Sequence, residues 1–282
     1  VAFTADGSEY KASGLVPGRP LNQYSLGEFN GYLRMATTQE QWTFEGGADT
    51  RNGVYVLHES GADLEITGKI ENLALGETIY AARFIGPRGF LVTFKRVDPL
   101  FTLDLTDPQN PQVVGKLKVP GYSDHIQLLD ENHLLTIGKD AVDTGSSAWV
   151  QGVQLTIFDI TDFANPVIPK AEGKKFKVVI GSRGTNSEAN YNPKAFNYFA
   201  AKEALAFPVD IYEEGMSTDP WDWGTHTFNG LIVYHVNAAD GFTELGRIPM
   251  VTDDQASGGC FWNYYGFSRG VFIGDYVYAV SN

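Results

Sequence analysis

A repeated strand–turn–strand unit constrains the fold of this chain more than any other feature. Each copy contains an apolar strand, a polar turn that is usually acidic, and a second strand in which Gly precedes or neighbours Lys or Arg. The copies are VYVLHESGADLEITGKI from Val54, LFTLDLTDPQNPQVVGKL from Leu100, LTIFDITDFANPVIPKAEGK from Leu155 and LIVYHVNAADGFTELGRI from Leu231. The equivalent positions His58, Asp104, Asp159 and His235 are 46, 55 and 76 residues apart. This uneven spacing indicates loops inserted into one kind of unit.

The turn inside the unit has a clear chemical basis. Asp107 and Asp162 can each accept a hydrogen bond from the backbone two residues further on. Pro111 and Pro166 then restrict the entry into the next strand. The pattern predicts a tight antiparallel hairpin.

Two further strand-like runs precede three of these hairpins. They are TIYAARFI and GFLVTFKR, then HIQLLD and HLLTIGKD, then AFNYFA and ALAFPVDIY. Four antiparallel strands repeated in this way predict the blades of a β-propeller. A β-sandwich is the alternative, but sandwich strands would not repeat the same turn in phase. We therefore expect an all-β chain that forms a single β-propeller domain over residues 1–282.

Each end of the chain has the pattern of half a blade. Residues 1–18 resemble the last two strands of a blade, and residues 270–282 resemble the first two. Joined, they would form a fifth blade that closes the ring and removes open sheet edges. Alternatively, the chain is the C-terminal portion of a longer propeller, and missing blades or a second chain complete the ring.

Composition excludes several classes of function. A net charge of −13 repels phosphate backbones, so we expect no nucleic-acid partner. No apolar run approaches the roughly 20 residues of a membrane helix, so we expect no membrane span in this sequence. The single Cys260 excludes an intrachain disulfide and any multi-cysteine metal site.

Calcium is the cofactor that best suits so many acidic turns, because it prefers carboxylate and carbonyl oxygens. The best local candidate is KDAVDTG, in which Asp140 and Asp143 precede Gly145. A solvated acidic loop is the competing interpretation.

The long stretch IYEEGMSTDPWDWGTHTF, residues 211–228, lacks a clear strand pattern and is a candidate binding loop. Trp221 and Trp223 could form an aromatic platform for a sugar or peptide, with polar contacts from Asp222 and His226. The competing interpretation is that these aromatic residues cover the edge of a blade.

Catalytic chemistry has weaker support. No G-x-S-x-G nucleophile turn occurs, and paired carboxylates cannot be assigned without distances, so no catalytic residue is predicted. The equivalent positions His58, Asp104, Asp159 and His235 are either structural polar anchors or contributors to a site at the propeller axis.

The chain resembles the secreted C-terminal β-propeller domain family of bacteria and archaea, which is distantly related to WD-type repeats. The resemblance runs through LNQYSLGEFNGYLRMATT from Leu21, VDPLFTLDLTDPQNPQVVGKLKVPG from Val97, DENHLLTIGKD from Asp130, LTIFDITDFANP from Leu155, KAFNYF from Lys194 and RGVFIGDYVYAVSN from Arg269. It implies export to an extracytoplasmic location, whether secreted, periplasmic or on the cell surface, and further blades before the start of this sequence.

One position departs from the family. Its members tend to have an Asp-His pair before the KAF segment, where this chain has Asn192 and Pro193. A metal or polar role for that pair is therefore not expected here. The resemblance supplies fold and compartment but no chemistry.

Three functions remain open. The first is an exported binding or scaffold propeller whose partner is a peptide, a glycan or a protein domain. The second is a metal- or carboxylate-dependent hydrolase or lyase with its site at the propeller axis. The third is a structural part of a larger secreted or surface protein.

Overall fold

A computed structural model describes residues 2–4, 7–42, 48–95, 98–143, 148–213, 224–250 and 267–281. Its contacts divide the chain into two compact units. The first unit comprises Val1–Val119 and Phe163–Pro166, and the second comprises Pro120–Asp162 and Val167–Asn282. A single domain over residues 1–282 stays a prediction.

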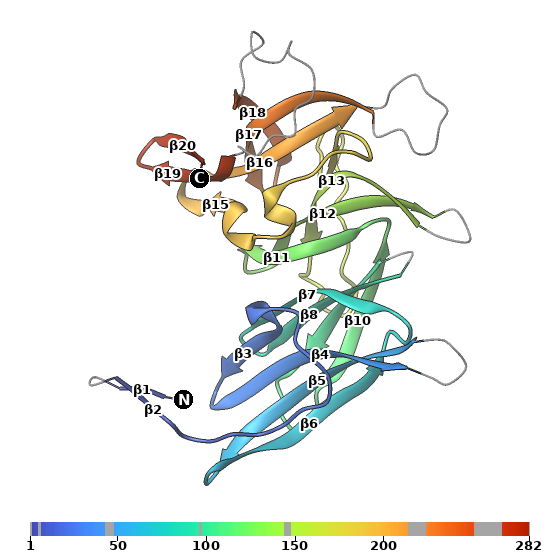
Figure 1. Cartoon of the computed structure of the whole chain (residues 1–282), viewed down its shortest axis with the longest axis vertical. Helices are drawn as coiled ribbons and strands as arrows, with labels where there is room; N and C mark the ends of the chain where they lie inside the picture. Colours follow the sequence, from blue (N-terminus) through green and yellow to red (C-terminus); the bar gives the residue numbers. More distant parts are fainter. Residues whose placement is uncertain are drawn as a thin grey trace. The chain divides into compact units, whose positions relative to one another are not determined.

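The first unit contains two four-stranded antiparallel sheets and a short hairpin (Figure 1). In each large sheet, every strand pairs with the next strand along the chain. The strands are β1 (Ala2–Thr4), β2 (Gly7–Glu9), β3 (Leu26–Phe29), β4 (Tyr32–Trp42), β5 (Ala48–Ser60), β6 (Asp63–Leu73), β7 (Thr78–Ile85), β8 (Arg88–Phe94), β9 (Asp98–Asp104) and β10 (Gln112–Val119), with one 3-10 turn, η1 (Gln23–Ser25).

The second unit repeats this plan with two more four-stranded antiparallel sheets and a hairpin. The strands are β11 (Tyr122–Asp130), β12 (His133–Asp143), β13 (Ala148–Asp159), β14 (Lys177–Ile180), β15 (Asn197–Phe199), β16 (Ala204–Glu213), β17 (Thr225–Asn237), β18 (Gly241–Pro249), β19 (Phe267–Ile273) and β20 (Tyr276–Ser281). The 3-10 turns are η2 (Glu188–Asn190), η3 (Pro193–Ala195) and η4 (Ala200–Lys202).

These sheets confirm the predicted all-β fold of four-stranded antiparallel blades. The predicted half-blades also form hairpins, β1–β2 and β19–β20. Hairpin β19–β20 lies beside β15 and β16, where Asn197 Nδ2 donates to the Gly270 carbonyl at 2.8 Å and the rings of Phe199 and Phe272 stack. A shared fifth blade remains a prediction.

The third repeat differs from its sequence pattern in one respect. The sequence predicts its second strand directly after the turn, yet Val167 makes only an isolated bridge to Asp159, and β14 begins at Lys177. Val167 still bonds to Asp159, but Pro169, two residues further on, has no N–H group and cannot donate to the strand ladder. The residues between Pro169 and β14 therefore form a loop.

Each unit has its own apolar core. The core of the first unit lies between its two large sheets and includes Val54, Leu91 and Leu103. The core of the second unit lies between its two large sheets and includes Ile137, Leu155 and Phe207. Strands β8 and β16 are buried along most of their length, which explains the continuous apolar runs in their sequences.

Acidic side chains fix the turns as the sequence predicts. Asp107 Oδ1 accepts a hydrogen bond from the Gln109 amide at 3.0 Å. At the equivalent repeat position, Asp104 and Asp159 accept bonds from the Thr106 and Thr161 amides at 2.9 and 2.8 Å. These contacts fit the interpretation of this position as a structural polar anchor.

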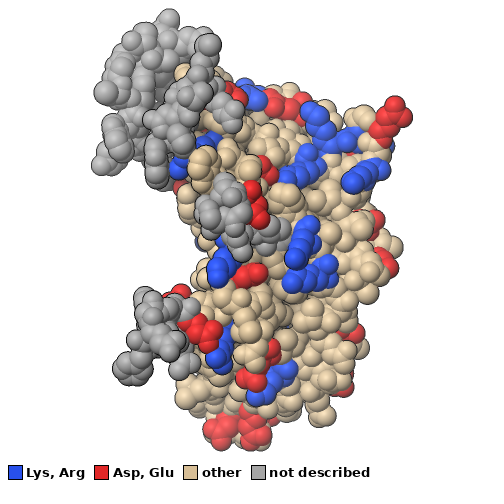
Figure 2. Space-filling model, turned by 90° about the vertical axis from the view of Figure 1, so that its right-hand side faces the viewer, with Lys and Arg blue, Asp and Glu red and all other residues tan. Residues whose placement is uncertain are grey.

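Charged residues of both signs are scattered over the face drawn in Figure 2. On the face drawn in Figure 2, Lys and Arg occur in small groups with Asp and Glu between them. Among the residues that the structure describes, no helix is long and apolar enough to cross a membrane.

Candidate functional site

The candidate site begins with an irregularity in the pairing of β16 and β17. Asp210 faces Asn229 and Ile211 faces Phe228, but Tyr212 then faces His226, so Thr227 is an extra residue in β17. Such a bulge changes which face of the sheet the following side chains occupy. It brings His226 to the face that carries Asp210 and Asn229.

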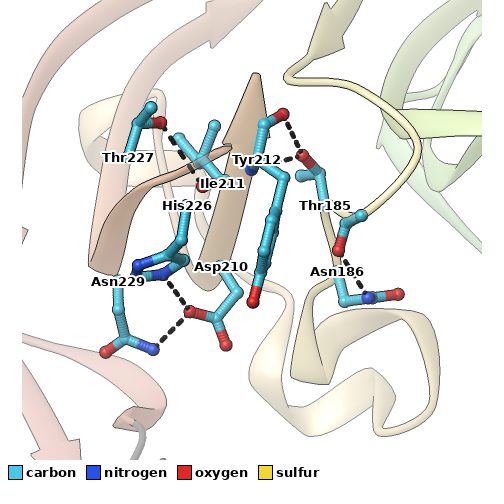
Figure 3. A network of polar contacts seen from close by, with 9 residues as sticks. Thr185, Asn186, Asp210, Ile211, Tyr212, His226, Thr227 and Asn229 are labelled. Carbon is cyan, nitrogen blue, oxygen red and sulfur yellow. Dashed lines mark hydrogen bonds and ion pairs between the residues drawn. The ribbon is translucent and has the colours of Figure 1, made fainter. Parts of the chain in front are cut away.

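Asp210 is the centre of the resulting polar cluster (Figure 3). Its Oδ1 atom accepts bonds from His226 Nε2 at 3.1 Å and from Asn229 Nδ2 at 2.6 Å. Tyr212 contacts the His226 ring edge-on, with ring centroids 5.0 Å apart. Within the described residues, no bond is formed to the other carboxylate oxygen, Oδ2, which Figure 3 shows pointing away from His226 and Asn229.

Hydroxyl groups near the cluster serve the backbone. Thr185 Oγ1 donates to the Tyr212 carbonyl at 3.0 Å and accepts from the Tyr212 amide at 2.9 Å. Thr227 Oγ1 lies 3.3 Å from the Ile211 carbonyl, and Ser187 Oγ donates to the Pro208 carbonyl at 2.5 Å. These bonds hold residues 185–187 against β16. The hydroxyl groups therefore have a structural role.

A cavity of about 190 Å³ opens beside Asp210. Its walls come from the segment around η2, from β16, from β17 and from the first residue of β19. The lining residues are Asn186, Ser187, Glu188, Tyr191, Pro208, Val209, Asp210, Asn229, Gly230 and Phe267. Pockets for drug-sized ligands measure about 300–1,000 Å³, so this cavity suits a small group such as one side chain.

The free polar groups of the cavity are mainly acceptors. Asn186 Nδ2 donates to the Gly184 carbonyl at 2.8 Å, and Asn229 Nδ2 is bound to Asp210. Glu188 is exposed and uses Oε1 to accept a bond from Asn192 at 3.2 Å. Tyr191 leaves 76% of its surface exposed. Carboxylate oxygens and an aromatic ring therefore face any ligand.

Only part of the predicted binding loop is described by the structure. His226 lies in β17 and joins the Asp210 cluster. Trp221, Asp222 and Trp223 lie outside the described residues, between Glu213 at the end of β16 and Gly224. The aromatic platform stays a prediction.

The predicted calcium ligands Asp140 and Asp143 both lie in β12. Asp140 Oδ1 is 2.9 Å from Lys177 Nζ, and both side chains of that ion pair are partly buried. Asp143 is exposed at the end of the strand. Within the described ranges, no group of three or more His, Cys, Asp or Glu side chains could hold a metal ion. Calcium binding there stays a prediction.

The two histidines of the repeat occupy separate surroundings. His235 Nε2 lies 3.0 Å from Glu203 Oε2, whereas the ring of His58 packs on Tyr32 with centroids 4.8 Å apart. Each contact is local to the blade that carries the histidine. Both contacts fit a structural role.

Sequence reasoning missed most of the cavity. No recognised motif includes Asp210, Asn186 or Glu188, and Asp210 lies inside an apolar strand pattern, PVDIY. That single acidic residue among buried neighbours was the available signal, because a charged residue in such a strand needs polar partners.

Four-stranded antiparallel blades define this molecule as a β-propeller protein. The chain belongs to the beta propeller domain family, whose model matches residues 1–282.

Two archaeal relatives carry similar sequence. An uncharacterised protein of Archaeoglobus fulgidus is 46% identical over 151 residues, which is 54% of this chain and 21% of the relative. An uncharacterised protein of Methanocaldococcus jannaschii is 42% identical over 154 residues, which is 55% of this chain and 23% of the relative. The match thus covers about a fifth of the length of each of these relatives.

Proposed function

We propose that this chain is the ligand-binding part of an exported β-propeller, and that its cavity beside Asp210 holds a cationic group of a peptide or protein partner. The observation that carries the proposal is the imbalance of hydrogen-bonding groups in the cavity. Asn186, Ser187 and Asn229 each commit a side-chain donor to an internal bond, whereas Asp210 Oδ2 and Glu188 offer acceptors.

Such a cavity matches an ammonium or guanidinium group. These cations carry only hydrogen-bond donors, and their bonds to carboxylates are about twice as strong as hydrogen bonds between neutral groups. An aromatic ring such as that of Tyr191 adds a cation–π contact worth about 0.5–1 kcal/mol at an exposed site. The net charge of −13 would also draw a basic partner toward the surface.

Short blocked peptides test the ligand class directly. Ac-Gly-Arg-Gly-NH2 should shift the NMR resonances of Asp210, Glu188 and Tyr191, whereas the uncharged Ac-Gly-Gln-Gly-NH2 should not. Asp210→Asn should lower the affinity for the Arg peptide by about tenfold, because one charge-assisted bond is lost. Asp240→Asn is a matched control, because Asp240 pairs with Lys174 outside the cavity.

Equal responses to the Arg and Gln peptides would reject a cationic ligand. A neutral oligosaccharide that shifts the same resonances, where the Arg peptide does not, would assign the cavity to a glycan. Glu188→Gln gives a second variant if Asp210→Asn unfolds, because Glu188 is exposed.

The predicted aromatic platform is a further part of the proposal. Residues 214–223 connect β16 to β17, the two strands that carry the Asp210 cluster, and they include Trp221 and Trp223. Replacing both with Ala should weaken binding of a longer basic peptide without changing the melting temperature. Unchanged binding would remove the loop from the site.

Export is supported by the acidic composition, by the single cysteine and by the resemblance to secreted propellers. Fractionation of the native organism, followed by the intact mass and terminal sequence of the protein, tests it. A cytoplasmic full-length product would contradict export.

A further inference from the structure

A buried lysine holds one wall of the cavity. Lys139 lies in β12 with only 5% of its surface exposed. Its ammonium group donates to the Thr185 carbonyl and to Asn186 Oδ1, the latter at 2.9 Å. Since Asn186 lines the cavity, this lysine contacts a residue of the cavity wall directly.

A second buried anchor holds the other end of the same segment. Asn190 is 8% exposed, and its Nδ2 donates to Asp124 Oδ2 at 2.8 Å and to the Gly138 carbonyl at 3.1 Å. Residues 185–190 are therefore tied to β11 and β12 at both ends. Between these anchors, Ser187 and Glu188 line the cavity.

The opposite side of this segment carries the cavity's central carboxylate. The Asn186 amide donates to the Asp210 carbonyl at 2.9 Å, and the Asp210 amide donates to the Asn186 carbonyl at 2.8 Å. A displacement of Asn186 would consequently move the backbone that carries Asp210.

Two groups of this network, Lys139 and Asp124, change charge near neutral pH. Burial lowers the pKa of Lys139 to about 8, against the opposing attraction of Asp124. Burial raises the pKa of Asp124 to about 7, although the Asn190 hydrogen bond and the Lys139 charge both oppose the rise. Loss of the Lys139 proton weakens its bonds, because bonds from an ionised donor are about twice as strong as neutral ones.

Other charged groups on the surrounding elements have partners of their own. On β12, Asp140 pairs with Lys177, and on β16, Asp210 binds His226 and Asn229. On η2, Glu188 is exposed and accepts a bond from Asn192. On β11, the buried His125 ring packs edge-on against Phe196. Asp124 is thus the charged group that counteracts the lowering of the Lys139 pKa.

We propose that Lys139 and Asp124 are positioning residues of the cavity, and that loss of the Lys139 proton, with the lysine still buried, weakens its bonds to the Thr185–Asn186 wall and lowers ligand affinity. The affinity part rests on the proposed function, whereas the response of the wall to pH does not. The protonation states of Lys139 and Asp124 would thereby control ligand binding in the cavity beside Asp210.

NMR of the unliganded protein tests the response of the wall. Side-chain carbonyl carbons of Asn186 and Asn190 are followed by 13C detection from pH 6 to 10, because amide protons exchange too fast at alkaline pH. In the native protein, the Asn186 resonance should show a transition centred near pH 8. Lys139→Met should abolish it, and Lys174→Met should not, because Lys174 is exposed and pairs with Asp240.

Asp124→Asn keeps the side-chain shape and provides a second variant if Lys139→Met does not fold. Removing the negative charge should move the Asn186 transition to lower pH, since Asp124 helps to keep Lys139 protonated. A pH-independent Asn186 resonance in the native protein would overturn the proposal. So would a transition that survives Lys139→Met.

The affinity of Ac-Gly-Arg-Gly-NH2 at pH 7.5 and 9.5 completes the test, because arginine stays charged over this range. We expect it to fall at least about fivefold at the higher pH, the lower end of usual couplings between sites, and to stay constant in a folded Lys139→Met variant. No peptide binding at any pH, with the NMR transition present, would reject the proposed function alone. Peptide binding that is independent of pH would reject the coupling alone.

Discussion

At the scale of single residues, buried polar side chains hold loops and strands of this propeller together. Arg34 is 3% exposed, donates to the Gly86 carbonyl at 2.7 Å and lies 5.6 Å from the centroids of the Phe29 and Phe84 rings. Burial lowers the pKa of Arg34, yet an arginine stays charged at physiological pH. Its contacts must therefore offset the cost of taking a cation out of water.

Replacing Arg34 with Ala should lower the free energy of unfolding by about 3–5 kcal/mol, because the Gly86 carbonyl loses its charged donor and two rings lose their packing partner. Urea denaturation measures the loss. Arg51→Ala is the matched control, since Arg51 is exposed and its pair with Asp49 should be worth at most about 1 kcal/mol. Equal losses would contradict a special role for Arg34.

The buried pair Asp124 and Lys139 predicts how stability depends on pH. The folded protein binds the Asp124 proton more tightly than the unfolded chain does, so this group makes stability fall as pH rises from about 4 to 7. The folded protein releases the Lys139 proton more easily, so stability should recover as pH rises from about 8 to 10.

Melting temperatures between pH 4 and pH 10 measure this profile. Asp124→Asn should remove the contribution of Asp124 to the acid-side fall, whereas Asp275→Asn, an exposed control, should not. An unchanged slope in Asp124→Asn would show that its carboxyl does not titrate as the structure indicates.

At the scale of elements, the bulge in β17 decides which side chains share a face. Thr227 is the extra residue, and it changes the phase of the strand between Phe228 and His226. The sequence THTF gives no sign of the change, because an alternating pattern looks the same in either phase. The Asp210–His226 contact therefore depends on Thr227 staying unpaired in the bulge.

Inserting one Ala between Ile211 and Tyr212 should give Thr227 a partner, restore regular pairing and turn His226 to the face of the sheet opposite Asp210. The Nε2–H tautomer that Asp210 fixes should then be lost, and 15N chemical shifts of the imidazole ring report it. Thr227→Ala keeps the bulge, so it should retain the tautomer. It should lower the free energy of unfolding by about 1 kcal/mol, because the hydroxyl bond to the Ile211 carbonyl is lost. A fixed tautomer in the insertion variant would contradict this account.

At the scale of the whole molecule, stability is divided between two cores. In repeat proteins, each unit contacts mainly its neighbours, so stability is approximately a sum of local terms. Phe207 is fully buried in the core of the second unit and lies against Phe196 and Tyr234. A cavity there should affect the second unit first.

Phe207→Ala should lower the free energy of unfolding by about 3–5 kcal/mol and reduce hydrogen-exchange protection in β12, β13, β16 and β17. Protection in β8 and β9, which belong to the first unit, should change little. Tyr276→Ala is the control, because its side chain is 70% exposed. Equal loss of protection in both units would show that they unfold as one.

The amino-acid sequence by itself determined the blade, because its signals are local: alternating or continuous apolar runs, an Asp such as Asp107 that fixes a turn, and a proline after it. The same locality explains the error in the third repeat, where the pattern continued but Pro169 prevented the strand from extending beyond Val167. Only the tertiary structure decided the site. Asp210, Asn186 and Lys139 come from three separate segments that backbone bonds and two buried anchors bring together, and one register shift brings His226 to Asp210. Contacts between distant segments depend on register and packing, which neither composition nor spacing records.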